Sequence, residues 1–105
     1  MDELEVTETI RIPLSEIDIK AVRAQGAGGQ NVNKVATAIH LRFDIRNSPS
    51  LPKGVRTKLL GGGDQRISTE GVLIIKAQEG RSQDRNRQAA LERLAEVIRA
   101  ATRKK

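Results

Sequence analysis

The sequence predicts an α+β fold in which helices cover one face of a three-stranded sheet. Two segments alternate apolar and polar residues with the period of a half-buried strand, and a third is a short continuous apolar run. Two further segments repeat apolar residues every three or four positions, as one face of a helix does. Their order is strand, strand, helix, strand, helix (β-β-α-β-α), and we expect it to form a single domain over residues 1–105.

The first half of the chain holds the two alternating segments. Residues 1–9 are acidic and weakly patterned, so we expect a frayed, mobile terminus, followed by Ile10 and Ile12 on the core. Alternation over residues 17–21 predicts a strand that leads into a glycine-rich loop. A longer alternation over residues 37–45 predicts the strand that follows this loop.

The second half predicts the remaining strand and both helices. A helix is expected from about residue 52 to residue 60, because Pro suits a first helical turn and the glycines at 61–63 end the helix. The apolar run at residues 72–75 predicts a central strand. Ser82 is suited to cap a long helix that extends to about Thr102, with apolar residues on one face and arginines on the other.

Charge is distributed unevenly along the chain and favours a polyanionic partner. Nineteen Lys and Arg against thirteen Asp and Glu give a net charge of +6. The first nineteen residues are mainly acidic, whereas residues 81–105 hold eight bases against three acids. RNA is the partner that this balance favours. Because Phe43 is the only aromatic residue, we expect contacts with phosphates and shape rather than stacking on bases.

Several kinds of site are excluded by composition. The absence of cysteine rules out disulfides and thiolate nucleophiles, and one histidine, His40, cannot build a usual zinc site or a Ser-His-Asp triad. We therefore expect no metal and no cofactor, and interpret His40 as a solvated strand residue. The N-terminal segment lacks a basic region followed by an apolar run, and nothing approaches membrane-spanning length. A cytoplasmic protein without a membrane partner is the expectation.

The loop between the first two predicted strands has an unusual composition. Residues 23–34 combine three glycines, several side-chain amides and a basic residue at each end. Glycine permits positive φ and close approach, and amides both donate and accept hydrogen bonds. A connection this long between strands is commonly functional. Its composition alone leaves a phosphate, a cofactor or a protein open as the partner.

Two separated blocks resemble one known family. Gly28-Gly29-Gln30 and the residues around it, 23–34, resemble the signature of the class I peptide-chain release factors and their relatives. Residues 81–83, with Asn86 and Arg87, resemble the family's second block. The resemblance covers residues 14–102 and implies a fold like that of the release-factor GGQ domain.

Within that superfamily, the short chain resembles the small codon-independent ribosome-rescue hydrolases, also at residues 39–45 and 75–79. This resemblance implies hydrolysis of peptidyl-tRNA on stalled ribosomes, without a stop codon. A basic tail beyond Lys105 is expected from the same resemblance. The implied partners are the ribosomal RNA of the peptidyl-transferase centre and the P-site peptidyl-tRNA, bound by a monomer.

The resemblance also implies roles for individual residues. Gly28, Gly29 and Gln30 are the expected catalytic residues: the backbone N–H of Gln30 contacts the reacting oxygen, its side chain orients water, and both glycines permit the necessary backbone geometry. The residues expected to contact RNA or the ribosome are Arg23, Asn33, Lys34, Arg81, Gln83, Arg87, Arg103, Lys104 and Lys105. Two alternatives remain open: the excised catalytic domain of a longer release factor, and a non-catalytic RNA-binding module.

Overall fold

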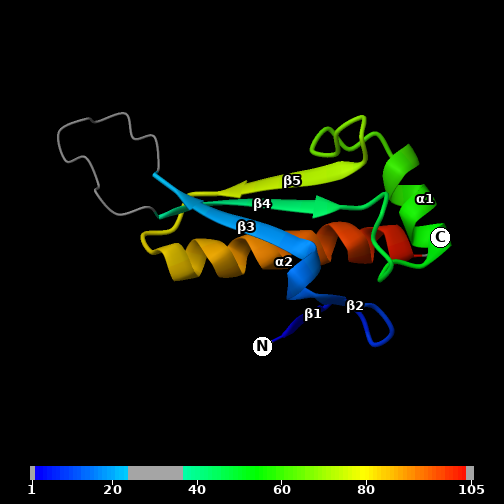
Figure 1. The fold of residues 1–105 in the computed structure, drawn as a ribbon, viewed down its shortest axis with the longest axis horizontal. Coiled ribbons are helices and arrows are strands. Elements are labelled where there is room, and N and C mark those ends of the chain that lie inside the picture. The colour runs from blue at the N-terminus through cyan, green and yellow to red at the C-terminus, as the bar shows by residue number, and fades with distance from the viewer. Residues whose placement is uncertain (1, 24–36, 104–105) are drawn as a thin grey trace.

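The computed structural model describes residues 2–23 and 37–103. These residues form an antiparallel sheet with a long helix across one face, which confirms the predicted α+β fold (Figure 1). A second helix packs against the last turns of the first, at one end of the sheet. The elements are β1 (Glu3–Glu5), β2 (Arg11–Pro13), a 3-10 turn (Leu14–Glu16), β3 (Ile17–Val22), β4 (Ala38–Asp44), α1 (Lys53–Gly61), β5 (Val72–Ala77) and α2 (Gln83–Thr102).

The central strand of the sheet is β4, and the strand order is β3-β4-β5. The prediction of a central strand at residues 72–75 is therefore wrong, because β5 lies at an edge. The run is apolar because Leu73 and Ile75 are buried on one face while a neighbouring segment, residues 66–68, runs beside the outer edge. The backbone N–H of Ile74 donates to the carbonyl of Arg66 at 3.0 Å.

The core lies between the sheet and α2. Cross-strand pairing places Ile19 opposite Leu41 and Leu41 opposite Ile75, so the apolar positions of all three strands share the face toward α2. On the helix, the buried residues Ala90, Leu94 and Ile98 recur every four positions. Full burial of a side chain the size of Leu or Ile stabilises a fold by about 1.5–3 kcal/mol. This repeated burial fixes the sheet against α2.

The acidic terminus is folded rather than frayed. β1 pairs with β2 in antiparallel register, and Leu4 lies opposite Ile12. Val6 is 3% exposed, and its carbonyl accepts a hydrogen bond from Nε of Arg99 at 2.7 Å. The expectation for residues 1–9 is therefore wrong over residues 3–6, where acids alternate with inward apolar side chains and so conceal a strand pattern. The predicted burial of Ile10 and Ile12 is confirmed.

The helix ends lie close to their predicted positions. Pro52 immediately precedes α1, and the triple glycine ends it, with Gly63 at φ +77°. Oγ of Ser82 accepts the N–H of Arg85 at 3.1 Å, which satisfies one of the free donors at the start of α2. No helix within residues 2–23 and 37–103 is long and apolar enough to cross a membrane.

Candidate functional site

The structure describes only some of the residues predicted for the site. The expected catalytic residues Gly28, Gly29 and Gln30 lie outside the described residues, as do Asn33, Lys34, Lys104 and Lys105. The structure describes Arg23, Arg81, Gln83, Arg87 and Arg103. What it shows is therefore how the two ends of segment 24–36 are held, and which charged groups surround them.

Adjacent strands hold the two ends of this segment. Val22, the last residue of β3, lies opposite Ala38, the first residue of β4. Ala38 is 1% exposed, although it lies on the face of the sheet away from α2. Arg23 directly follows Val22 in the chain and is exposed. The predicted catalytic segment thus begins and ends at the same end of a well-packed sheet, where β3 stops and β4 starts. A precisely placed site depends on this kind of rigid support. We call this end of the sheet the loop end.

Asn86 connects three segments at the loop end. Its side chain is fully buried, and Nδ2 donates to the carbonyl of Thr37 at 2.7 Å. The same Nδ2 donates to the carbonyl of Gly80 at 3.2 Å, while Oδ1 accepts the N–H of Gly80 at 2.8 Å. A carboxylate could accept but could not donate, so these three bonds require an amide. Asn86 fixes the start of α2 to the residue just before β4.

Sequence reasoning had assigned no role to Asn86 beyond the block that it resembles, although a signal for one was present. Asn86 precedes Ala90, Leu94 and Ile98 at intervals of four, so it lies on the buried stripe of α2. A polar residue on such a stripe needs internal partners, because an unpaired buried amide is costly. The stripe predicts burial, but the partner Thr37, 49 positions away, follows only from the fold.

Gly80 lies too close to Asn86 to carry a side chain. A Cβ at residue 80 would approach Oδ1 of Asn86 to 2.8 Å and Cβ of Arg85 to 3.3 Å. The absence of a side chain therefore allows the backbone of Gly80 to bond with the amide through both its N–H and its carbonyl. The φ of Gly80 lies outside the left-handed region. Glycine is therefore needed here for the close approach to Asn86 and not for an unusual backbone conformation.

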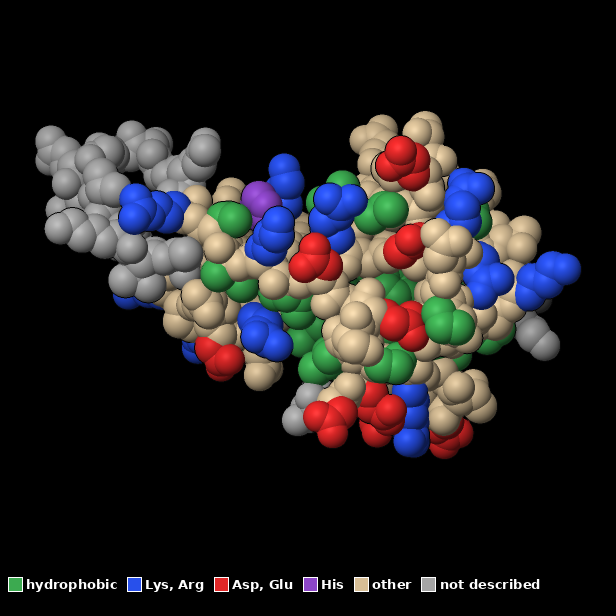
Figure 2. Space-filling model, in the orientation of Figure 1, with side chains coloured by type: hydrophobic (Ala, Val, Ile, Leu, Met, Phe, Trp, Pro, Cys, Tyr) green, Lys and Arg blue, Asp and Glu red, His purple; other side chains and the backbone are tan. Residues whose placement is uncertain are grey.

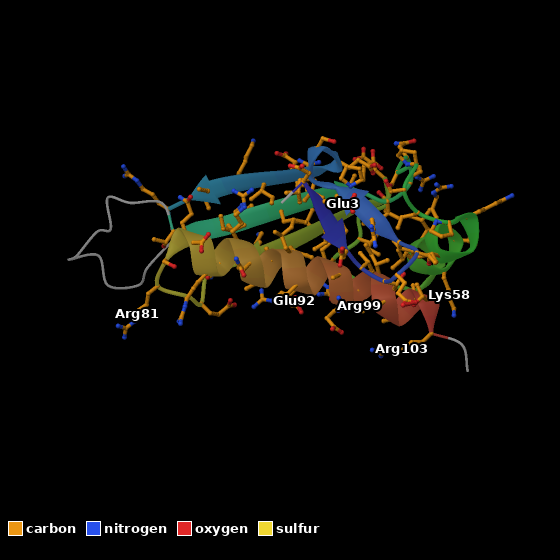
Figure 3. All side chains as sticks on the ribbon, turned by 90° about the horizontal axis from the view of Figure 1, so that it is seen from below. Glu3, Lys58, Arg81, Glu92, Arg99 and Arg103 are labelled. Atoms are coloured by element: carbon orange, nitrogen blue, oxygen red, sulfur yellow. The ribbon has the colours of Figure 1, made fainter. Side chains whose placement is uncertain are left out.

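The described residues that were predicted to contact RNA lie at two different ends of the molecule. Arg81 directly follows Gly80, and Figure 3 shows it at the start of α2. Gln83 and Arg87 lie in the first two turns of α2, and both are exposed. Arg103 instead lies at the other end of α2, where its carbonyl accepts a hydrogen bond from Nζ of Lys58 at 3.2 Å (Figure 3). The structure therefore does not bring Arg103 to the loop end.

The shifted carboxyl groups of the described chain are poor bases near neutral pH. A hydrogen bond from Arg93, with Nη2 at 2.9 Å from Oε1, holds the pKa of Glu79 below its usual value. Arg66 lowers the pKa of Asp64 in the same way. No group of three His, Cys, Asp or Glu side chains suited to a metal occurs within the described residues. His40 lies on the sheet face away from α2, half-buried.

Comparison with known proteins gives consistent relatives. The RF-1 domain family model matches residues 4–105. Peptidyl-tRNA hydrolase ArfB of Pseudomonas putida is 56% identical over 98 residues, which cover 93% of this chain and 71% of that protein. Large ribosomal subunit protein mL62 of Mus musculus is 32% identical over 91 residues, covering 87% of this chain and 44% of that protein.

More distant matches are peptide-chain release factors. Peptide chain release factor 1 of Deinococcus radiodurans is 33% identical over 96 residues, which cover 88% of this chain and 20% of that protein. The chain thus spans most of ArfB but less than half of mL62 and of the release factor. The family model matches nearly the whole chain, and the predicted resemblance is confirmed. The chain belongs to the RF-1 domain family.

Proposed function

We propose that this protein hydrolyses peptidyl-tRNA on stalled ribosomes and acts without reading a stop codon. The observation that carries the proposal is the Gly28-Gly29-Gln30 sequence in a chain that is 56% identical to a peptidyl-tRNA hydrolase over most of both lengths. The sheet and Asn86 support it, because they fix both ends of the segment that contains these residues. The expected partners are P-site peptidyl-tRNA and the ribosomal RNA of the peptidyl-transferase centre.

The reaction replaces an ester bond with an acid and an alcohol. Water adds to the carbonyl carbon of the ester, and the bond to the 3′ oxygen of the terminal adenosine breaks. The peptide leaves with a carboxylate, and the tRNA regains its hydroxyl. Segment 24–36 contains no carboxylate, histidine or cysteine to act as a base. Its contribution must therefore come from placement and from hydrogen bonds to developing charge, with proton transfer left to RNA and solvent.

Each residue of the tripeptide has a separate part in this mechanism. The backbone N–H of Gln30 donates to the reacting oxygen, and the side-chain amide orients water. Gly28 and Gly29 permit the backbone geometry and the close RNA approach that aim this N–H. Arg23, Asn33, Lys34, Arg81, Gln83 and Arg87 hold the surrounding segments to RNA. Their basic members make binding salt-dependent, with a slope of roughly 0.7–0.9 per phosphate contact. The proposal places a monomer in the cytoplasm.

The test is peptide release from ribosomes that carry truncated mRNA and P-site peptidyl-tRNA. Gly29→Ala should reduce the release rate about a hundredfold, the scale of losing one preorganised donor. Gly54→Ala is the matched control, because a Cβ at residue 54 meets nothing within 4 Å. Release at the wild-type rate by Gly29→Ala would refute the placement mechanism.

The same assay separates the two alternatives. Binding to ribosomes without peptide release would support a non-catalytic RNA-binding module. Release that requires an added stop-codon-reading domain would support the catalytic part of a longer release factor, a candidate favoured by the matches to peptide chain release factor 1. Release by the chain alone, on ribosomes without a stop codon in the A site, would support the proposed rescue activity.

A further inference from the structure

We propose that the sheet face opposite α2 binds the phosphate backbone of ribosomal RNA through a basic row formed by Lys20, His40 and Lys76. This inference rests on the proposed function, because it takes the ribosome as the partner. It adds a second contact surface to the loop end, made by residues that neither the tripeptide nor the second family block contains. Figure 2 shows Lys and Arg side chains gathered with the single histidine over the strands.

The basic row follows from the strand register. Lys20 of β3 lies opposite His40 of β4, and His40 lies opposite Lys76 of β5. Their neighbours on either side point toward α2, so all three side chains lie on the open face. Adjacent strands are about 5 Å apart, so the row extends roughly 10 Å across the sheet. Lys20 and Lys76 are exposed and His40 is half-buried. Two lysines, with a histidine between them, are therefore presented on one face of the sheet.

The basic row itself contains no acidic residue. Within residues 2–23 and 37–103, the side chains of Lys20, His40 and Lys76 make no ion pair. The next row differs in composition, because it places an acid, Asp18, opposite Arg42. Acidic side chains gather instead around β1 and β2, at the bottom of Figure 2. Unpaired lysines on an exposed surface favour a polyanion, because phosphate contacts release bound counterions.

Beside the basic row, beyond the outer strand β5, lies a hollow in the surface. An open hollow of about 380 Å³ lies between β5 and the segment beside it, and it is lined by Gln65, Arg66, Ser68, Ile74 and Lys76. Asp64 holds Arg66 in position through contacts of 2.9 Å and 3.1 Å. Phe43, the single aromatic residue, is 1% exposed on the other face. With no exposed aromatic to stack on bases, this face is suited to phosphates and not to base recognition.

The position of the row favours ribosomal RNA over the substrate tRNA. The last paired residues at the loop end, Val22 and Ala38, lie two positions beyond the row, about 7 Å along the strands. In the sequence, the proposed catalytic residues lie between these two strand ends, whereas the row lies within the sheet. The side chains of the row project out of the plane of the sheet and not along the strands toward the loop end. A ligand on this face therefore lies alongside the sheet and not at the strand ends that lead into segment 24–36, so we assign it to ribosomal RNA.

The test compares two charge-matched double variants for binding to 50S subunits without tRNA. Lys20→Gln/Lys76→Gln removes two charges from the basic row, and Lys53→Gln/Lys58→Gln removes two from α1, at the far end of the sheet. The first variant should bind at least about tenfold more weakly than the control, and its salt dependence should fall by roughly 1.5 in slope. Matching thermal unfolding of the two variants shows that their folds are equally intact.

The outcomes separate this inference from the proposed function. Equal affinity and equal salt slope in the two double variants would overturn the basic row, as would failure of the unmodified chain to bind 50S subunits. A difference that appears only with P-site tRNA present would assign the face to tRNA and overturn the choice of ribosomal RNA. Peptide release is measured separately: an unmodified chain that binds but releases no peptide refutes the hydrolase, while the binding comparison still decides the basic row.

Discussion

The two ends of the sheet are held in different ways. At the loop end, one buried side chain, Asn86, makes three hydrogen bonds that connect Thr37 and Gly80 to α2. At the opposite end the bonds are distributed. The Glu16 carboxylate accepts from Ser48 at 2.7 Å and from Ser50 at 2.5 Å, and Nη2 of Arg56 donates to the carbonyl of Ser48 at 2.6 Å.

This difference indicates what each end contributes. The far end also packs Leu51 and Leu59 into the core, so the loss of one polar bond there leaves several contacts in place. At the loop end, substitution of Asn86 alone removes the hydrogen bonds that connect Thr37 and Gly80. We therefore expect far-end changes to affect stability alone, and loop-end changes to affect both stability and peptide release.

The largest effect is expected from Asn86→Ala. Removal of the amide leaves the carbonyl of Thr37 and both backbone groups of Gly80 without their partner, at a cost of about 2–3 kcal/mol in the free energy of unfolding. Urea denaturation measures this loss. Release at saturating ribosomes should also fall, because Thr37, next to the proposed catalytic segment, is no longer fixed to α2. A folded Asn86→Ala protein with the wild-type maximal release rate would contradict the positioning role.

Gly80→Ala should have the next largest effect. Its new Cβ would approach Oδ1 of Asn86 to 2.8 Å, and displacing that side chain costs about 1–2 kcal/mol. If the two residues act as one unit, Gly80→Ala/Asn86→Ala should cost less than the sum of the single changes. Unfolding free energies of the four proteins complete this cycle. Strict additivity would mean that Gly80 has a separate role.

Glu16→Gln tests the far end. An amide oxygen can still accept from one serine, but the amide nitrogen cannot accept from the other, so we expect a loss of about 1 kcal/mol in unfolding free energy. Peptide release, measured on the folded fraction, should remain at the wild-type rate. A fall in release as large as that of Asn86→Ala would remove the distinction between the two ends.

The smallest effect concerns acid stability at the far end of β4. Hydrogen bonds from the side chain and the backbone N–H of Asn47 lower the pKa of Asp44 below its ordinary value of 3.8. A lowered folded pKa contributes stability above the unfolded pKa, and this is lost as pH falls through the folded pKa. Asp44→Asn should therefore lose less stability than wild type between neutral pH and about pH 3, as thermal midpoints would show. Equal acid sensitivity would contradict this.

Periodicity predicted most of the fold because burial dictates it. The alternation in β3 and β4 and the spacing in α2 follow directly from one covered face of the sheet. Strand order did not follow, because the run in β5 reflects cover from residues 66–68 as much as from α2. β1 was missed because its acids conceal Leu4.

The candidate site was predictable in part. The resemblance identified the family, and the family match confirms the family. The predicted helix from Ser82 to about Thr102 already separated Arg81 from Arg103, and the structure confirms that they lie at opposite ends of α2. The basic row was beyond sequence reasoning, because Lys20 and Lys76 become neighbours of His40 only through strand register. The roles of Gly28, Gly29 and Gln30 stay predictions.

The hydrogen bond between Arg99 and the carbonyl of Val6 has a consequence for folding during synthesis. It joins two residues that are 93 positions apart in the chain, so Val6 is made well before Arg99. A two-stranded hairpin is marginal by itself in water, so β1 and β2 have little to pack against until α2 has been made. At about 5–20 residues per second, that delay is on the order of 10 s. The hairpin of β1 and β2 therefore reaches its final packing only after α2 has left the ribosome that makes it.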